Sequence, residues 1–563
     1  MRGVQCASCP RPTAAALPLV DISRTRCATV ALLLTTISAL RAQEEGLAGR
    51  LREVRITTND VFAATDERLL TQVVNALHWQ TRREVVAREI WLRRGDHVDA
   101  RLAAELERNL RGLGLFSDVT VRLVATGQPG EVDLEVITRD RLTLNVGAGG
   151  SYVGGVSGFR TSLGEGNLLG RGDRLVASFA ENSEGEYRGS VAFTDLHVLD
   201  SWHTATVRAS RTDEGDSAGL DVRRPFKHLA DPRGYGVSIA QDDTEADYYR
   251  GGESVAEVPY RRSALLADMA WAAGSRDARR FLGVAFAAEQ VDHAIARGPL
   301  AASIHVPGDT WSVFFGPTAS WQWVTGYRKV EGLDTLDYVQ DLTLGPSVGM
   351  TLGARWRDED GLAGALQPEA GLAVAFASEP LADVFTNLGA RGGVRGDDAD
   401  AVGWNASVFA RAFALATELQ TFAASCTFDA VEETQDLPRE LTLGEDNGLR
   451  GYKARLFAGT RRVRTNLEHR FDTGLELATL RFGLIAFTDT GWVGTGSDLG
   501  RPWTSAGVGL RIGSKPLLGD GVMRIDVAKP FDDIVDQSDG LKVSVTIGQV
   551  FTFGGNASGL GVR

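Results

Sequence analysis

The sequence predicts a transmembrane antiparallel β-barrel that follows one small α/β domain. Glycine accounts for 65 of the 563 residues, about 12% against a usual ~7%, which is typical of a chain rich in strands and turns. The longest apolar run, residues 28–40, has 13 residues and is shorter than the ~20 that a membrane-spanning helix needs. After Arg141 helical periodicity gives way to two-residue alternation for more than 400 residues, which indicates strands.

The first residues resemble a secretory signal. Two arginines precede the apolar run and small residues follow it, as in signals that are cleaved after export. We expect residues 1–42 to be removed and residues 43–50 to form a short linker. Three of the four cysteines lie in the removed segment. The mature chain then keeps only Cys426, which excludes an intrachain disulfide.

Composition and motifs exclude several function classes. The net charge of −13 argues against a nucleic-acid binder, because such proteins need basic surfaces to contact phosphates. Zinc-protease, serine-hydrolase and phosphate-loop motifs are absent from the sequence. The acidic clusters at 358–361 and 397–400 lack EF-hand spacing, so we assign them to turns or outer loops. We therefore expect no enzyme activity, no cofactor and no metal.

Residues 51–140 predict the α/β domain, in the order β-α-α-β-β. Helical spacing of leucine and valine predicts the first helix, and Asp99 is a suitable cap for the second, which Gly114 ends. Two strands joined by a Gly-Gln-Pro-Gly turn complete the domain. The five predicted elements are Leu51 to Thr57, Asp66 to Trp79, Asp99 to Leu113, Asp118 to Val124 and Val132 to Thr138.

This region resembles a POTRA (polypeptide-transport-associated) domain of the BamA/TamA outer-membrane family. The resemblance lies in Arg93-Arg94-Gly95-Asp96 and in the stretch from Glu105 to Val119, which reads ELERNLRGLGLFSDV. The apolar residues of that stretch can also be explained as the hydrophobic core of the domain. The resemblance implies a periplasmic domain whose strand edges can bind an extended client chain by β-augmentation.

Residues 141–553 predict the barrel, with residues 554–563 as a C-terminal tail. Divided among the sixteen strands that we expect, the 412 residues from Leu142 to Phe553 give about 26 per strand, which fits ~10 spanning residues plus alternating short turns and long loops. In Thr460 to Phe471 charged and apolar residues alternate, which predicts one face toward a wet lumen. The last strand is predicted from Leu541 to an aromatic end at Phe551 and Phe553.

A second resemblance to the same family lies in a predicted loop. Leu449-Arg450-Gly451-Tyr452 matches an inward-folding loop motif, and Glu468 and the stretch Phe487-Thr488-Asp489-Thr490-Gly491 stand where the family places lumenal acids. The resemblance implies that Arg450 anchors the loop through charge-assisted hydrogen bonds to these carboxylates. The alternative is a solvated surface arginine.

The glycines of residues 164–173 resemble the first periplasmic hairpin of the family barrel. Their spacing, G-x-G-x-x-x-G, does not match a dinucleotide-binding loop, and a strand-like segment rather than a helix follows. A turn explains the glycines better, because glycine adopts positive φ without strain.

The resemblance implies an outer-membrane protein that inserts or assembles client polypeptides without a nucleotide. The client would pass from the POTRA strand edge to a weak seam between the first strand, Leu142 to Tyr152, and the last. The predicted seam residues are Gly147, Gly149, Gly150, Val545, Ile547, Phe551 and Phe553. Expected partners are unfolded outer-membrane or secreted polypeptides, outer-membrane lipids and periplasmic accessory proteins. Two alternatives remain, a two-partner-type secretion pore for a dedicated secreted protein and a passive channel or surface antigen.

Overall fold

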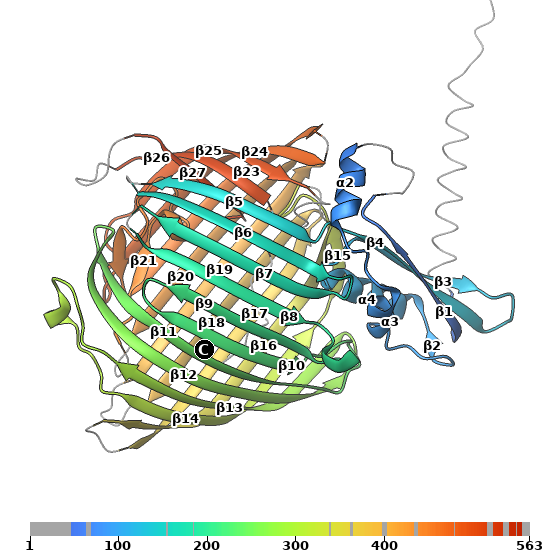
Figure 1. Ribbon diagram of the computed structural model, residues 1–563, viewed down its shortest axis with the longest axis horizontal. Helices are drawn as coiled ribbons and strands as arrows, with labels where there is room; N and C mark the ends of the chain where they lie inside the picture. The colour runs from blue at the N-terminus through green and yellow to red at the C-terminus, as the bar shows by residue number, and fades with distance from the viewer. Residues whose placement is uncertain are drawn as a thin grey trace, which may run out of the picture. The chain divides into compact units, whose positions relative to one another are not determined.

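The structure is a computed structural model of the full chain (Figure 1). It describes residues 47–62, 69–153, 156–183, 185–336, 339–360, 364–396, 402–432, 437–477, 479–514, 522–532, 540–547 and 549–553. The predicted signal, the tail and the acidic cluster at 397–400 lie outside these residues. Among the described residues no helix has the length and apolar character required to cross a membrane.

The chain divides into two compact units. The described part of the smaller unit comprises residues 47–54, Arg93–Ala103 and Arg122–Glu135, and the larger unit contains the remaining described residues. The predicted boundary near residue 140 therefore does not coincide with the division by contacts.

The N-terminal elements form a four-stranded sheet of order β2-β1-β4-β3 and three helices. In chain order they are β1 (Gly49–Asn59), α2 (Leu69–Leu77), α3 (Arg83–Arg88), β2 (His97–Val98), α4 (Ala100–Gly112), β3 (Phe116–Ala125) and β4 (Glu131–Asp140). The Asp99 side chain accepts a hydrogen bond of 2.9 Å from the Leu102 N–H and so caps α4 as expected. Sequence periodicity missed α3 and β2, which are too short to produce a periodic pattern.

A closed antiparallel barrel forms the greater part of the larger unit. Its strands run obliquely around the barrel in Figure 1. They are β5 (Leu144–Val153), β6 (Val156–Leu168), β7 (Asp173–Asn182), β8 (Tyr187–Asp195), β9 (Thr204–Thr212), β10 (Asp216–Arg224), β11 (Arg233–Arg250), β12 (Glu253–Gly274), β13 (Ala278–His293), β14 (Thr310–Trp323), β15 (Gly326–Val330), β16 (Gln340–Glu359), β17 (Ala365–Leu381), β18 (Val384–Gly396), β19 (Val402–Thr417), β20 (Gln420–Glu432), β23 (Arg461–Leu477), β24 (Leu480–Gly494), β25 (Trp503–Gly513), β26 (Val522–Pro530) and β27 (Lys542–Ile547).

The predicted number of sixteen strands is corrected to twenty for the described barrel. β14 and β15 both pair with β16 and follow one another along it, so they occupy one place in the ring. The prediction assumed about 26 residues per strand with long loops on one side. Several connections are instead tight: two residues join β11 to β12, β17 to β18 and β19 to β20.

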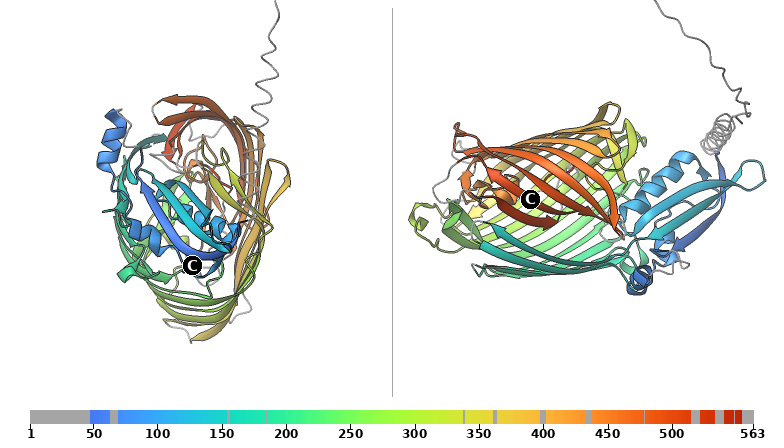
Figure 2. Two further views of the ribbon diagram at one scale, coloured as in Figure 1. Left: turned by 90° about the vertical axis from the view of Figure 1, so that its right-hand side faces the viewer. Right: turned by 90° about the horizontal axis from the view of Figure 1, so that it is seen from above.

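The two faces of the barrel wall differ in chemistry. On β23, Asn466 and Glu468 are buried on the inner face, whereas Leu467 between them is 51% exposed on the outer face. The predicted alternation of this strand is therefore confirmed. Large apolar side chains are likewise exposed on strands around the ring, whose opposite walls are seen in Figure 2. They include Val146, Leu163, Val176, Val191, Val207, Ile239, Leu282, Leu372, Leu388, Val408, Leu484 and Val508.

The hairpin between β6 and β7 agrees with the turn interpretation. Leu169, Gly170 and Gly172 have φ angles of 56°, 71° and 79°, and the chain continues as strand β7 rather than as a helix. Glycine occupies two of these three positions, and it adopts positive φ without strain.

The last strand is shorter than predicted. β27 ends at Ile547 rather than at Phe553, and β27 is the hydrogen-bonded neighbour of β5 that closes the barrel. Phe551 and Phe553, predicted as seam residues, instead pack in a buried apolar cluster with residues of β16, β18, β19 and β20. The alternation of the sequence could not reveal this, because it has the same form on a strand and on an extended segment that leaves the sheet.

Candidate functional site

A loop inside the barrel carries the predicted LRGY motif. The loop connects β20 to β23 and contains a short hairpin of β21 (Leu441–Leu443) and β22 (Phe457–Gly459), with one 3-10 turn, η3 (Glu445–Asn447), between them. Gly448, which precedes the motif, and Gly451, its third residue, have φ angles of 105° and 88°. These left-handed residues reverse the chain on both sides of Arg450, which directs its side chain toward the barrel wall.

Arg450 is 1% exposed and is held by Asp489 of β24. Its Nε and one terminal nitrogen donate hydrogen bonds of 2.7 and 2.8 Å to the two carboxylate oxygens of Asp489. The backbone N–H of Arg450 donates a further bond of 3.2 Å to the same carboxylate. This bidentate arrangement fixes both the position and the plane of the guanidinium group.

Three further groups complete the environment of the guanidinium group. Its remaining terminal nitrogen lies 2.9 Å from a Glu468 oxygen and 3.7 Å from an oxygen of Asp526 on β26. Its central carbon lies 3.5 Å from the centroid of the Phe487 ring, a cation–π contact. The structure thus brings the predicted Arg450, Glu468, Phe487 and Asp489 together at one place on the lumen wall.

The electrostatics of the site are those of a compensated buried charge. Burial lowers the pKa of Arg450, but Asp489, Glu468 and Asp526 outweigh it, so the net direction is upward. A buried ion pair of this kind is costly to break, because removing one partner leaves an uncompensated charge. The site can hold a loop in one position.

The other residues of the motif fill the space around the anchor. Leu449 and Tyr452 are buried in a cluster with Leu443 and Leu456. The Tyr452 hydroxyl donates a hydrogen bond of 2.8 Å to the Thr504 carbonyl. Gly491 leaves room for Leu443, because a Cβ there would lie 2.7 Å from a methyl group of this buried side chain, which would have to move.

Sequence reasoning missed several neighbours of Arg450. Asp526 receives a hydrogen bond of 2.6 Å from Arg511 of β25, and the Asn466 amide donates one of 2.7 Å to Asp489. Asn466 belongs to the predicted lumenal face of its strand, so the alternation could have suggested it. Asp526 and Arg511 stand in strands with no distinguishing motif.

The predicted seam residues lie on two neighbouring strands, except for the last two. Gly147, Gly149 and Gly150 belong to β5, and Val545 and Ile547 to β27. These strands close the ring. β27 has six residues and β26, its other neighbour, has nine.

Comparison with solved structures finds other β-barrel proteins. The chain is similar to BamA from Haemophilus ducreyi lacking POTRA domains 1–3, with 12% identity, 89% of this chain and 84% of that chain covered, and a TM-score of 0.39. It is similar to CdiB from Acinetobacter baumannii, with 11% identity, coverage of 89% and 73% and a TM-score of 0.42. It is also similar to CdiB from Escherichia coli, with 12% identity, 89% of this chain and 76% of that chain covered, and a TM-score of 0.42.

No protein-family model matches the chain, and no curated protein matches its sequence. The structural similarities have TM-scores below 0.5 and do not identify a function.

Proposed function

We propose that this protein resides in the outer membrane and inserts or assembles client polypeptides there, with the β5–β27 seam as the place where client strands form. The observation that carries the proposal is the closure of a twenty-strand ring by a strand of six residues. A short closing strand contributes few ladder hydrogen bonds, so it opens at lower cost than the longer pairings elsewhere. An opened seam offers unpaired backbone groups to an incoming strand.

The outer face of the barrel supports the membrane location. Exposed leucine, valine and phenylalanine side chains on its strands suit contact with lipid, whereas the inner face carries buried charged pairs. A closed ladder also leaves no lipid-facing backbone group without a partner, which a membrane-spanning structure requires. Outer-membrane lipids are therefore proposed as its surroundings, with the N-terminal domain in the periplasm.

The N-terminal sheet offers a place for the client to bind first. β3 is the terminal strand in the order β2-β1-β4-β3 and has ten residues. Its outer edge can receive an extended chain by β-augmentation. Periplasmic accessory proteins could use the same edge, as expected for a POTRA domain.

A secretion pore is the second candidate, in which the loop inside the barrel would act as the gate. A client crossing the lumen would have to displace a loop that Arg450 holds through three carboxylates. The two candidates differ in the part that must open, the seam for insertion and the loop for secretion. A passive channel requires neither opening.

Disulfides placed across the seam test the proposal. In a Cys426→Ser background, Val545→Cys would be combined in turn with Asn145→Cys, Gly147→Cys and Gly149→Cys. The protein would be placed in lipid vesicles, and the folding of an added unfolded outer-membrane barrel would be followed by its gel mobility before and after heating. We expect the protein to accelerate the folding of the added barrel. The oxidised seam variant should lose this acceleration, and a reducing agent should restore it.

The matched control is a disulfide elsewhere in the wall. Ser178 and Ser190 lie on β7 and β8 with their hydroxyls 2.7 Å apart, so cysteines at these positions suit a disulfide. This variant should remain active when oxidised. Full activity of a cross-linked seam would contradict insertion through the seam and would leave the secretion pore, which conductance and export of a client through the lumen would then test.

A further inference from the structure

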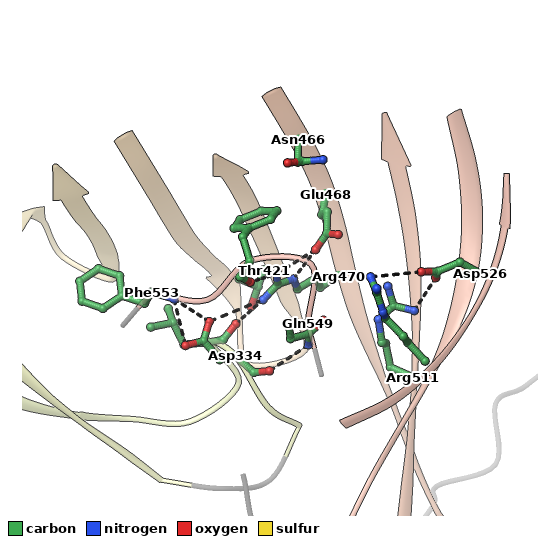
Figure 3. Close-up of polar contacts among 12 residues, drawn as sticks. Asp334, Thr421, Asn466, Glu468, Arg470, Arg511, Asp526, Gln549 and Phe553 are labelled. Carbon is green, nitrogen blue, oxygen red and sulfur yellow. Dashed lines mark hydrogen bonds and ion pairs between the residues drawn. The ribbon is translucent and has the colours of Figure 1, made fainter. Parts of the chain in front are cut away.

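Residues 549–553, which follow β27 in the chain, lie in the lumen and contact its lining. We call them the segment. Figure 3 shows Phe553 and Gln549 facing Asp334, with Arg470 between Asp334 and Glu468. Phe551 and Phe553 are 7% and 3% exposed. We call the surface that receives them the lumenal dock, defined by Leu333, Asp334, Phe385, Asn387, Arg411, Phe413 and Arg470.

The dock contacts the backbone of the segment at consecutive residues. Arg470, Arg411 and Asn387 donate hydrogen bonds of 3.3, 3.0 and 2.8 Å to the carbonyl oxygens of Phe551, Thr552 and Phe553, in that order. The Phe553 N–H donates to both oxygens of Asp334 at 3.0 Å. Backbone contacts of this kind do not depend on which side chains the bound segment carries.

Selectivity comes from two aromatic positions. The Phe553 ring lies 6.3 Å from that of Phe385 and 5.9 Å from that of Phe413, both edge-on. The Phe551 ring lies 5.8 Å from Phe413 and is covered by the Arg470 guanidinium group at 5.2 Å. Phe551 and Phe553 are two positions apart, so the dock suits an extended chain with aromatic residues at alternate positions.

Contacts between the wall and the β15–β16 loop hold the dock in place apart from the segment. Gln340 donates a hydrogen bond of 3.0 Å to Asp334 and accepts one of 2.9 Å from its backbone N–H. Arg470 donates one of 2.6 Å to the Leu333 carbonyl, and Thr421 donates one of 3.0 Å to the Gly332 carbonyl. Since these bonds do not involve residues 549–553, we expect the dock to keep its shape when the segment leaves.

We propose that the lumenal dock is a peptide-binding site for an extended client segment with aromatic residues at positions i and i+2, and that residues 549–553 occupy it in the absence of that client. The proposal rests on the proposed function for the identity of the ligand as a client polypeptide. The attached segment competes at the effective concentration of a short tether, on the order of millimolar. A free peptide therefore binds the intact protein weakly and binds tightly when the attached segment cannot dock.

A direct binding experiment tests this site. The probe is a fluorescent peptide with the sequence of residues 545–553, VTIGQVFTF, and the control peptide carries serine in place of both phenylalanines. Binding is followed by fluorescence anisotropy with the full-length protein in lipid nanodiscs. The double variant Phe551→Ser/Phe553→Ser vacates the dock. We expect it to bind the probe at least tenfold more tightly than the unsubstituted protein and to bind the control peptide at least tenfold more weakly than the probe.

Substitutions of the dock itself locate the binding. Introduced into the vacated protein, Asp334→Asn and Asn387→Ala should each weaken probe binding at least fivefold. Asp429→Asn is the matched control, because Asp429 is another lumenal carboxylate, which pairs with Arg462 and Arg464. Equal binding of both peptides, or equal loss in the Asp429 variant, would overturn the proposal.

A second measurement keeps the test decisive if the vacated protein does not form a barrel. The unsubstituted protein is then incubated with excess probe carrying a photoreactive phenylalanine at the position of Phe553, and the cross-linked residues are mapped. Cross-links to β18 and β19 support the dock, and cross-links confined to other strands contradict it. Neither assay requires client insertion, so binding without insertion would retain the peptide site and reject the proposed function alone.

Discussion

The guanidinium group of Arg450 and the carboxylate of Asp489 face each other through two parallel hydrogen bonds of 2.7 and 2.8 Å, with both side chains at most 1% exposed. Arg450 belongs to a loop and Asp489 to strand β24, so the pair ties a segment without regular structure to the rigid wall. Arg450 is therefore one of the contacts that fix the loop's position, beside Tyr452 and the apolar cluster around it, and its share can be measured.

Arg450→Ala should release the loop while the barrel still forms. Removing one partner of a buried ion pair costs about 3–5 kcal/mol, which we expect as a lower urea midpoint and as faster trypsin cleavage after Lys453 and Arg455. Client transport in cells should fall. Arg450→Lys should restore only part of both properties, because an ammonium group cannot make the planar two-pronged contact.

The control for this prediction is Arg211→Ala. Arg211 pairs with Asp216 at 3.6 Å with both side chains exposed, so its loss should cost at most about 1 kcal/mol. Normal transport and normal protease resistance in Arg450→Ala would refute the anchoring role.

Gly451→Ala should destabilise the loop by two effects at once. The residue has a φ of 88°, which strains any L side chain, and its Cβ would lie 3.0 Å from that of Ala528. Gly474 has a φ of 66° with no atom within 4 Å of its Cβ position, so Gly474→Ala carries the strain alone. We expect a loss of about 1 kcal/mol for Gly474 and a clearly larger loss for Gly451, measured as shifts in the urea midpoint. Equal shifts would mean that Ala528 moves aside without loss of stability and that the close contact has no effect.

The N-terminal domain should depend on Phe116. Its side chain is 1% exposed, and replacing a buried phenylalanine by alanine costs about 3–5 kcal/mol. We expect a fragment of residues 47–140 to unfold cooperatively by circular dichroism and Phe116→Ala to lower its free energy of unfolding by that amount. Val73→Ala is the control, since Val73 is 45% exposed. A fragment without a cooperative transition would contradict an independent domain.

The loop should be more firmly held at acidic pH. Burial raises the pKa of Glu445 from 4.5 to about 6, against the hydrogen bond with Ser544 and the charge of Arg524. The folded state therefore binds this proton more tightly than the unfolded chain does. The resulting stabilisation is complete below pH 4.5 and is lost as the pH rises through 6.

Urea titrations between pH 4.5 and 8 test this effect. A shift of this size corresponds to about 2 kcal/mol. Glu445→Gln should remove that part of the pH dependence, since the amide cannot ionise. Ser544→Ala should move the pH at which this stabilisation is lost to a higher value, because it removes a hydrogen bond that lowers the pKa of Glu445. An unchanged pH profile in the glutamine variant would contradict the assignment to Glu445.

The sequence predicted the Arg450 anchor more fully than the dock. Arg450, Glu468 and Asp489 stand within a recognisable motif and on a strand with charge alternation, so their meeting in the lumen could be expected. Asp334 lies in a loop without a motif, and its partner Phe553 has the alternation of a strand although it leaves the sheet. Non-local docking of this kind depends on how strands far apart in sequence come to face one another, which periodicity does not encode.

The number of strands was missed for a different reason. The length of the chain fixes the total of strand and loop residues but not their ratio. Two-residue connections, such as residues 382–383 between β17 and β18, leave more residues for strands than long loops would. The left-handed φ of 61° at Asp383 accommodates this tight reversal, and aspartate tolerates that region better than most residues do.

Glu468 connects the Arg450 loop to the lumenal dock through one carboxylate. One of its oxygens lies 2.9 Å from Arg450 and the other accepts a hydrogen bond of 2.9 Å from Arg470, so a single negative charge is shared between two cations. Loss of Arg470 from this place also removes its repulsion of the Arg450 guanidinium group, so the contact between Glu468 and Arg450 tightens as the contact with Arg470 is lost. Thermodynamic reciprocity then requires that loosening Arg450 strengthens the hold on Arg470 by the same free energy. The two contacts of Glu468, one to the Arg450 loop and one to the lumenal dock, are therefore expected to be lost in turn rather than together.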